Sequence, residues 1–383
     1  MAAPERVRLL TGAFVLASMA HFLHGLAWNM FLHLPGFLKG LGAGEQRIGV
    51  IYGVAAVTAI AARPSLGRVM DTRGRRPLII AGGVVSTVIC ASYLLVHDLG
   101  PLIWFIRIGH GVGEAMLFAS LFAYAAEIVP VARRIEGIAL FGVSGMVPMG
   151  LGGLVGDMLL PLGGYRLLFA TAAALAAAAL VLSLPLREPP MQTGEPPRGI
   201  VAALVQRDLV PLWCVGTVFA TAVCANVTFI STFVATTGIG SVGAFFAPYS
   251  ASAVVLRVLL GSLPERLGPK RVLLPAMVLM ALGLAVLTVA QSSGAVFLAG
   301  ALCGLGHGYT FPIVLGLVLA RARPRERGAA LAIYTALFDA GMLLGGPLLG
   351  SLIAATSYRT MFGTAAMGVA AGLLVFFAWD RRR

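Results

Sequence analysis

Long apolar stretches recur along the whole chain, and short polar segments separate them. Each stretch is at least about 18 residues long, enough to cross a hydrocarbon core of about 30 Å at about 1.5 Å per residue. The pattern predicts an all-α polytopic membrane protein with twelve membrane-spanning helices. The expected spans are residues 9–34, 46–64, 78–96, 101–128, 135–160, 165–184, 210–237, 241–262, 272–290, 295–320, 328–355 and 358–379.

The longest polar segment, residues 185–208, lies near the middle of the chain and is rich in proline, which is typical of a linker. We therefore expect a six-helix bundle over residues 1–184 and a second one over residues 209–383. The first apolar stretch is too long for a signal peptide and carries polar residues, so it is predicted to be an uncleaved helix.

Composition agrees with a membrane protein, because only 11% of the 383 residues are charged and the mean hydropathy is +0.93. The net charge of +13 raises the alternative of nucleic-acid binding. With both termini in the cytoplasm, however, most Lys and Arg residues fall at cytoplasmic helix ends and loops, as the positive-inside rule expects. The charge therefore indicates the orientation of the chain and its attraction to the lipid bilayer, with no nucleic-acid partner.

An internal repeat is visible in the charged segment GRVMDTRGRR that begins at Gly67, which returns in part as GSLPERLGPKR at Gly261. Two further matches have similar offsets: GHG at 109–111 recurs at 306–308, and YRLLF at 165–169 recurs as YRTMF at 358–362. These matches predict a duplicated six-helix unit, with both copies in the same orientation.

The chain resembles the major facilitator superfamily over essentially its whole length. The resemblance rests on the twelve spans, the central linker, the signature Gly67-x3-Asp71-x2-Gly74-Arg75-Arg76, and a second motif at Arg107. It implies two six-helix bundles around a central cavity that opens alternately to each side. It also implies that the signature is a latch that favours the outward-facing state.

The expected conformational gate contains the two copies of the signature and the carboxylates that can pair with their cations. Asp71 can face the positive end of a helix in the opposite half, whereas the arginines have the alternative role of topological anchors. The gate residues are Gly67, Asp71, Gly74, Arg75, Arg76, Glu127, Gly261, Glu265, Gly268, Lys270, Arg271 and Glu326.

Ionisable residues at membrane depth are functional candidates, because charges there are costly. Arg107, His110 and Glu114 share one face of the fourth span. Glu114 is a candidate proton carrier, and the resemblance links Arg107 to proton transfer. The alternative is a buried ion pair of Arg107 and Glu114 that only ties helices together.

Further candidates for proton coupling or for the substrate cavity are His21, His24, Asn226 and His307. A hydrogen bond between helices is the alternative role of His307. Asp339 lies at mid-span with no base nearby on its helix, so it must be protonated, hydrated or paired across helices. The chain shows no metal-ligand spacing, and we expect no metal site.

His33, His97 and Asp157 are expected near outer helix ends as solvated residues. Two glycine-rich segments, residues 142–153 and 341–350, each contain a proline and predict faces suited to close helix packing. The Gly-Pro pair typical of family antiporters is absent from the first segment, which weakens the prediction of antiport.

The prediction for function is a secondary transporter, active as a monomer, that exports a small amphipathic compound in exchange for protons. The alternative is uptake of a small organic anion or a sugar-like metabolite, with Arg107 and the histidines as ligands. No phosphate-binding loop and no hydrolytic motif is present, so neither ATP use nor an enzyme is expected. No cofactor is expected, since the proton gradient supplies the energy.

Overall fold

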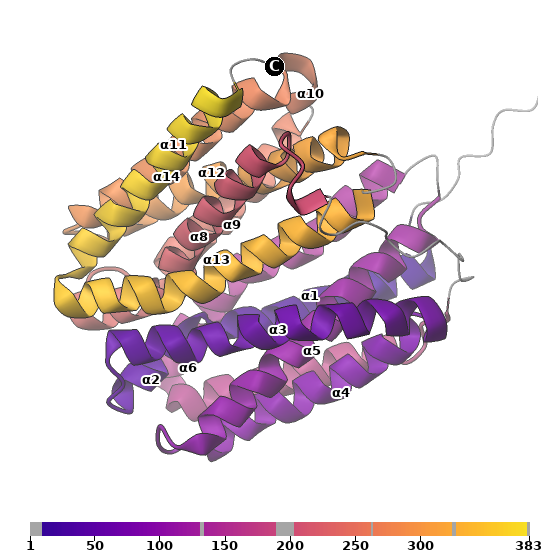
Figure 1. Ribbon diagram of the computed structural model, residues 1–383. Coiled ribbons are helices and arrows are strands. Elements are labelled where there is room, and N and C mark those ends of the chain that lie inside the picture. Colours follow the sequence, from indigo (N-terminus) through magenta and orange to yellow (C-terminus); the bar gives the residue numbers. More distant parts are fainter. Residues whose placement is uncertain (1–9, 131–133, 189–202, 262, 324–326, 381–383) are drawn as a thin grey trace, which may run out of the picture.

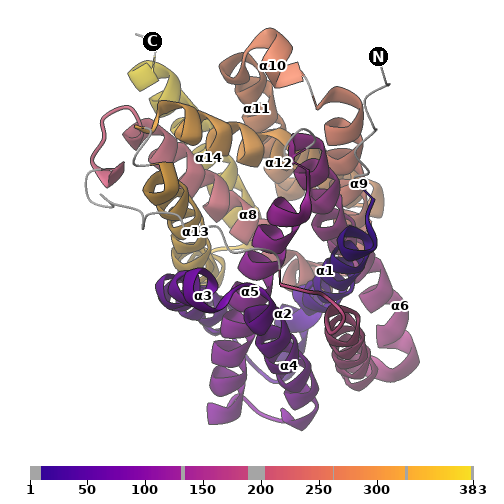
Figure 2. The same ribbon diagram turned by 90° about the vertical axis from the view of Figure 1, so that its right-hand side faces the viewer.

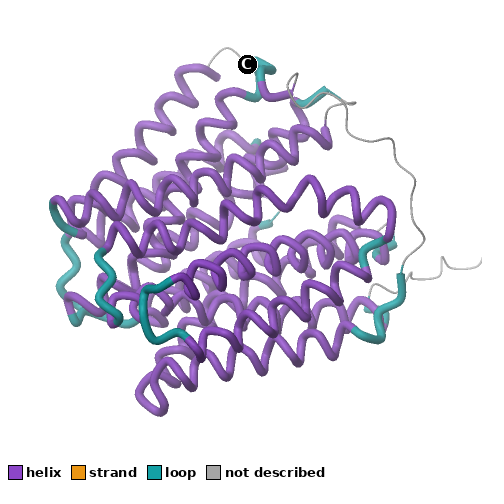
Figure 3. Tube along the Cα trace, turned by 60° about the horizontal axis from the view of Figure 1, so that its bottom comes forward, coloured by secondary structure: helices purple, strands orange, loops and turns teal. Residues whose placement is uncertain are grey.

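The computed structural model describes residues 10–130, 134–188, 203–261, 263–323 and 327–380, and these are almost entirely helical (Figure 3). Glu326 and part of the expected linker lie outside the described residues, as do the side chains of Asp71 and Glu265.

The described part of the first half contains eight elements, which run from α1 to α6 and occupy the lower part of Figure 1. They are α1 (Gly12–Met30), η1 (Phe31–His33), α2 (Leu34–Gly40), α3 (Glu45–Arg73), α4 (Arg76–Ser92), η2 (Tyr93–Leu95), α5 (Pro101–Ile128) and α6 (Arg134–Ser183).

Seven elements, which run from α8 to α14, make up the second half as far as its residues are described. They are α8 (Val210–Thr237), α9 (Val242–Leu260), α10 (Leu263–Leu267), α11 (Pro269–Thr288), α12 (Ser293–Arg321), α13 (Arg327–Ala355) and α14 (Tyr358–Asp380).

Local sequence signals explain where these helices begin and end. The Ser241 hydroxyl accepts from the Ala244 N–H at the start of α9, which is a side-chain N-cap. Gly238 ends α8 in the left-handed region at φ 67°. Gly163 and Gly164 have non-helical dihedrals that divide α6 into two crossings. The predicted break between residues 160 and 165 is therefore confirmed.

Ten helical segments of the described chain are long and apolar enough to span a membrane, by length and composition. One of them, residues 140–183 of α6, provides two crossings because of its break. The charged α3 is not among the ten, although its 29 residues are sufficient in length. Counting α6 twice and adding α3 gives the twelve crossings that the sequence predicts.

The two halves contact each other mainly through two helix pairs, α3 with α13 and α6 with α9. Figure 2 shows α3 beside α13, with α1 and α6 on the other side of the molecule near α9. Glycines allow the helix backbones to meet at both contacts. A Cβ on Gly49 would lie 2.2 Å from the Gly346 carbonyl oxygen, and one on Gly153 would lie 3.2 Å from the Gly243 Cα. The two glycine-rich segments therefore serve close packing, as predicted.

These contacts are concentrated toward one end of the molecule. We call the end that holds Gly74 and Glu188 the terminal end, and the end that holds Lys39 and Tyr358 the far end. Gly49, Gly153 and Gly346 belong to the far half of their helices. Toward the terminal end, in contrast, no atom of the described residues lies within 4 Å of a Cβ built on Gly67 or Gly142. The halves are thus in backbone contact at the far end and farther apart at the terminal end.

Candidate functional site

Glu114 and His24 form a hydrogen-bonded pair between α5 and α1 inside the first half. The His24 Nε2 atom lies 2.7 Å from the Glu114 Oε2 atom. The histidine side chain is only 5% exposed, whereas the Glu114 side chain keeps 22% of its surface accessible. Glu114 is 13 residues from the start and 14 from the end of α5, so it lies near the middle of the crossing.

His21 lies one turn before His24 and contacts α6. Its Nδ1 atom is 2.8 Å from the Ser144 hydroxyl oxygen. Because that hydroxyl donates to the Phe141 carbonyl, it accepts from the Nδ1–H of His21, and the Nδ1 tautomer follows from this arrangement. The ring also stacks on Phe141, with the two centroids 4.6 Å apart. Sequence reasoning missed Ser144, because no pattern links it to a histidine so distant in the chain.

Asp339 pairs with Arg63 across the boundary between the two halves. The Arg63 Nη2 atom lies 2.6 Å from the Asp339 Oδ2 atom, joining α3 to α13. The two side chains are 30% and 17% exposed, so neither is fully removed from solvent. Of the three states that the sequence allows for Asp339, the structure shows pairing across helices. Sequence reasoning missed Arg63 as the partner, because no local pattern links it to a carboxylate so distant in the chain.

The two acidic residues belong to different halves but lie at similar depth. Asp339 is 12 residues from the start of α13, which lies toward the terminal end, or about 18 Å at about 1.5 Å per residue. Glu114 is 14 residues from the end of α5, which lies toward the same end, or about 21 Å. The mid-depth region therefore contains one carboxylate from each half, and the basic partners of both belong to the first half.

Arg107 does not pair with Glu114, so the structure does not show the ion pair that was the alternative to a role in proton transfer. Its Nε and Nη2 atoms donate to the Ile51 and Tyr52 carbonyl oxygens of α3, at 3.2 and 2.7 Å. The side chain is buried, and the guanidinium lies over the Tyr52 ring, 4.9 Å from its centroid. On its own helix Arg107 contacts His110, which lies one turn further along. Glu114 lies two turns further along and pairs with His24 instead.

His110 lies beside this arginine in the interior of the first half. Its Nδ1 atom is 3.1 Å from the Tyr93 hydroxyl and 3.2 Å from the Arg107 Nη1 atom. Since both neighbours are donors, Nδ1 accepts and the ring carries its proton on Nε2. Phe31 and Trp28 pack edge-on against the ring. His110 is therefore held in a packed interior, apart from the pair of His24 and Glu114.

The second half repeats this arrangement around His307. The Tyr249 hydroxyl of α9 lies 2.5 Å from the His307 Nδ1 atom of α12, and Phe219 packs edge-on against the ring. This is the hydrogen bond between helices that was the alternative to a substrate role. Asn226 is also fully buried, in the packed interior of α8.

At the terminal end, the first signature contains the expected pair of cation and carboxylate. The Arg75 Nη2 atom lies 2.5 Å from the Glu127 Oε1 atom, which confirms Glu127 as a partner. Arg76 instead donates to the carbonyl oxygens of Leu186 and Leu184 at the end of α6. Both contacts stay within the first half.

Glu188 is a further partner of the signature, and the sequence analysis missed it. Its two carboxylate oxygens accept from the backbone N–H groups of Arg75 and Arg76, each at 2.7 Å, at the start of α4. The positive end of the helix favours a carboxylate there. Gly74 has φ +89°, and a Cβ on it would lie 2.4 Å from the Glu188 carboxyl carbon. The glycine of the signature is thus required both for the turn and for this contact.

The second copy of the signature matches the first in backbone conformation but not in its surroundings. Gly268 has φ +92° and precedes α11, so it matches Gly74 in conformation. No atom of the described residues lies within 4 Å of a Cβ built on Gly268. Gly261 follows α9, and Lys270 and Arg271 lie in the first turn of α11.

Two side chains expected at solvated helix ends are in fact contact residues. His33 is buried, with its Nε2 atom 3.1 Å from the Gly153 carbonyl oxygen. Asp157 accepts from the Gly243 N–H of the other half at 2.6 Å. The prediction of solvation is wrong for both, because the closed far end covers them.

Twelve crossings in two halves, with charged pairs at mid-depth, define a polytopic membrane transporter. Among the described residues, no group of three or more His, Cys, Asp or Glu is arranged to hold a metal ion. The Major Facilitator Superfamily matches residues 17–263 and 225–383, and the chain belongs to that family. It is therefore a secondary transporter and not an enzyme.

Curated relatives agree with this assignment. An uncharacterised MFS-type transporter of Salmonella typhimurium is 25% identical over 348 residues, which is 88% of this chain and 85% of that protein. An uncharacterised MFS-type transporter of Burkholderia mallei is 25% identical over 354 residues, with shares of 89% and 85%.

Solved structures share the fold. A mutant of the nucleoside transporter NupG has a TM-score of 0.81 at 15% identity, over 96% of this chain and all (100%) of that one. The human organic anion transporter MFSD10 has a TM-score of 0.70 at 16% identity, over 95% and 98% of the two chains. The fold predicted from the sequence is confirmed.

Proposed function

We propose that the chain is a proton-coupled exporter of a small amphipathic compound in a bacterial inner membrane, with its terminal end in the cytoplasm. The observation that carries this proposal is the presence of two carboxylates at mid-depth, one in each half, each held by a basic side chain. Such groups can release or bind a proton when their partner moves, because a neighbouring charge alters proton affinity.

The basic residues of the terminal end support the orientation. Arg75 and Arg76 lie there, and the positive-inside rule assigns such residues to the cytoplasm. With this orientation, the far-end contacts of Gly49 with Gly346 close the outer side. The structure then represents an inward-facing arrangement.

The coupling step that we propose centres on the pair of Arg63 and Asp339. This pair joins α3 to α13, so a movement of these helices past each other separates its charges. An unpaired carboxylate at this depth costs several kcal/mol (roughly 3 or more), and a bound proton removes that cost. Asp339 thus alternates between an arginine and a proton, and Glu114 does the same with His24.

The surroundings of Arg107 favour an amphipathic substrate over an organic anion. Its Nε and Nη2 donors are engaged by backbone carbonyls, and the side chain is 2% exposed. Arg63 is already paired with a carboxylate. These two arginines therefore offer little to an incoming anion, whereas Glu114 keeps accessible surface for a cationic or protonated group.

We propose that the first loop signature holds the terminal end closed in the outward-facing arrangement. In the present arrangement no described atom lies within 4 Å of a Cβ built on Gly67. A latch that favours the outward-facing state is expected to be disengaged in an inward-facing one. We propose that Asp71→Asn lowers the outward-facing population, to be measured by paired spin labels at the terminal end. An unchanged distance distribution would remove Asp71 from the gate.

Transport by purified protein in proteoliposomes tests the main proposal. A pH-sensitive dye inside the vesicles reports proton movement after addition of a panel of amphipathic cations, zwitterions and neutral compounds. We expect at least one compound to drive proton flux, and Glu114→Gln and Asp339→Asn each to abolish it. Asp98→Asn is the matched control, because this exposed carboxylate contacts the N–H of Gly100 in its own loop. Coupling lies elsewhere if both test variants retain flux.

A further inference from the structure

We propose that the far end carries a two-part latch that stabilises the observed arrangement and opens when the outer side opens. The first part is the contact of Asp157 with the start of α9. The second part is the contact of Lys39 with Thr236 and Tyr358. The inference rests on the exchange between two arrangements, and it is independent of proton coupling. Each part joins the first half to the second, and the two parts lie at different helix contacts.

The first part is a carboxylate of one half at the positive end of a helix of the other. Asp157 is on α6, and its Oδ2 atom accepts from the Gly243 N–H at 2.6 Å, within the first turn of α9. The helix dipole and the unpaired N–H groups of that turn favour a negative charge there. The other oxygen, Oδ1, lies 3.9 Å from the His33 Nε2 atom. Asp157 thus belongs to the first half and binds the backbone of the second.

Glycine at position 243 makes this contact possible. A Cβ there would lie 2.5 Å from the Asp157 Oδ2 atom and 2.9 Å from the Leu154 Cα. Gly156 similarly leaves room for the His33 ring, because a Cβ on it would lie 2.2 Å from the ring atoms. The carboxylate therefore reaches α9 only because neither helix has a side chain in the way.

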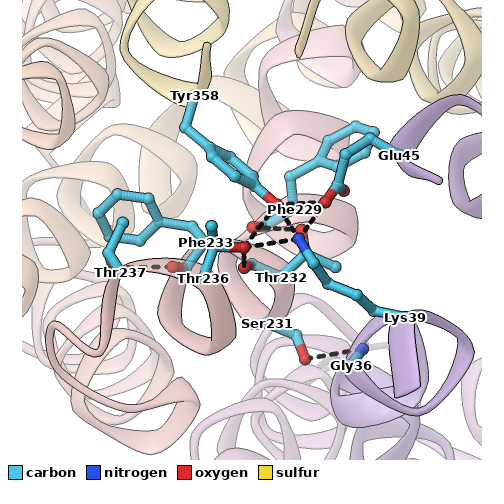
Figure 4. A network of polar contacts seen from close by, with 10 residues as sticks. All are labelled: Gly36, Lys39, Glu45, Phe229, Ser231, Thr232, Phe233, Thr236, Thr237 and Tyr358. Atoms are coloured by element: carbon cyan, nitrogen blue, oxygen red, sulfur yellow. Dashed lines mark hydrogen bonds and ion pairs between the residues drawn. The ribbon is translucent and has the colours of Figure 1, made fainter. Parts of the chain in front are cut away.

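The second part is the polar network drawn in Figure 4, which is built around Lys39. Its Nζ atom lies 2.5 Å from the Glu45 Oε1 atom of the same half. It also donates to the Thr236 hydroxyl at 2.5 Å and to the Tyr358 hydroxyl at 3.0 Å, both in the second half. The Tyr358 hydroxyl donates in turn to Glu45.

The ammonium group is well matched to this position. It has three N–H donors, and the network supplies three acceptors from α3, α8 and α14. A hydrogen bond from the Gly36 N–H to the Ser231 hydroxyl, at 3.2 Å, also joins α2 of the first half to α8 of the second (Figure 4). A second arrangement in which the far end opens must break all the contacts to Thr236 and Tyr358.

Spin-label distances across the far end test the latch. We would place labels at Leu162→Cys and Ser292→Cys, exposed sites in the first and second half. The background is Cys214→Ser, since the other three cysteines are buried. We expect Asp157→Ala and Lys39→Met each to raise the ratio of long to short distances, on the order of fivefold. Asp157→Asn should have a smaller effect, because the amide oxygen still accepts from Gly243.

Asp98→Asn and Arg47→Met are the matched controls. Asp98 caps its own loop, and Arg47 donates to the Leu99 carbonyl within the first half, so neither should alter the distances. Gly243→Ala tests the same contact without removing a charge, and it should imitate Asp157→Ala. Unchanged distances in Asp157→Ala and Lys39→Met, in protein that elutes as a folded species, would overturn the latch. Proton flux that is retained in Glu114→Gln and Asp339→Asn, together with the expected distances in the latch variants, would overturn only the proposed coupling.

Discussion

The Arg63 Nη2 atom lies 2.6 Å from the Asp339 Oδ2 atom, and this ion pair connects the two halves near the middle of the membrane crossing. It is the charged contact between α3 and α13, helices whose far ends are in backbone contact at Gly49 and Gly346. A movement that opens the far end acts directly on the environment of both side chains. The pair therefore links the position of the halves to the charge state of one carboxylate.

The first prediction is that this pair behaves as a unit. Removing one member of a buried ion pair costs about 3–5 kcal/mol, and the partial exposure of this pair reduces that cost. Arg63→Met and Asp339→Asn should each lower thermal stability in detergent, and the double variant should be more stable than the sum of the two losses predicts. A double-mutant cycle of unfolding midpoints measures the interaction. Additive losses would show that the two residues act independently.

The second prediction separates His24 from Glu114. His24→Gln keeps a donor for the Glu114 carboxylate but removes the titrating ring. If Glu114 carries the proton, the number of protons per substrate should stay the same while the transport rate falls about tenfold, the effect of roughly 1.4 kcal/mol. His97→Asn, at an exposed site, is the control. A changed proton stoichiometry would instead assign the proton to the histidine.

The twelve crossings and the break at Gly163 were predictable, because apolar length and turn residues decide them locally. Glu127 was predictable as a partner of Arg75, because the sequence assigns both residues to cytoplasmic helix ends. The partners of Glu114 and Asp339 were not predictable. His24 and Arg63 are distant in sequence, and only the packing of α1 on α5 and of α3 on α13 brings them to these carboxylates.

The third prediction concerns the turn of the loop signature. Gly74→Ala places a side chain at φ +89° and against the Glu188 carboxylate. Strain of this kind costs about 1–3 kcal/mol, so the unfolding temperature should fall by several degrees. Glu188→Gln should have a smaller effect, since it removes charge but keeps an acceptor for α4. Gly316→Ala is the control, because its Cβ would meet no described atom within 4 Å. Equal effects at both glycines would contradict this account of the turn.

The fourth prediction is that Arg107 cannot be replaced by lysine. The guanidinium donates to two carbonyl oxygens of α3 from different nitrogens, a fork that one ammonium group does not reproduce. Arg107→Lys should lose roughly one charge-assisted hydrogen bond, about 1.5–3 kcal/mol. We expect faster hydrogen exchange at the amides of α3 than in the parent protein. Exchange that stays unchanged would mean that the lysine satisfies both carbonyls.

The last prediction uses the backbone contact of α3 with α13. A methyl group on Gly49 would lie 2.2 Å from the Gly346 carbonyl oxygen, a distance that forces the two helices apart. At Gly53, in contrast, the nearest atom of Leu343 would be 3.3 Å away, which a small adjustment accommodates. Gly49→Ala should therefore disfavour the arrangement seen here and lengthen the distance between labels at Leu162→Cys and Ser292→Cys, whereas Gly53→Ala should leave it nearly the same. If the two variants give the same distances, the close approach at Gly49 does not control how the halves meet.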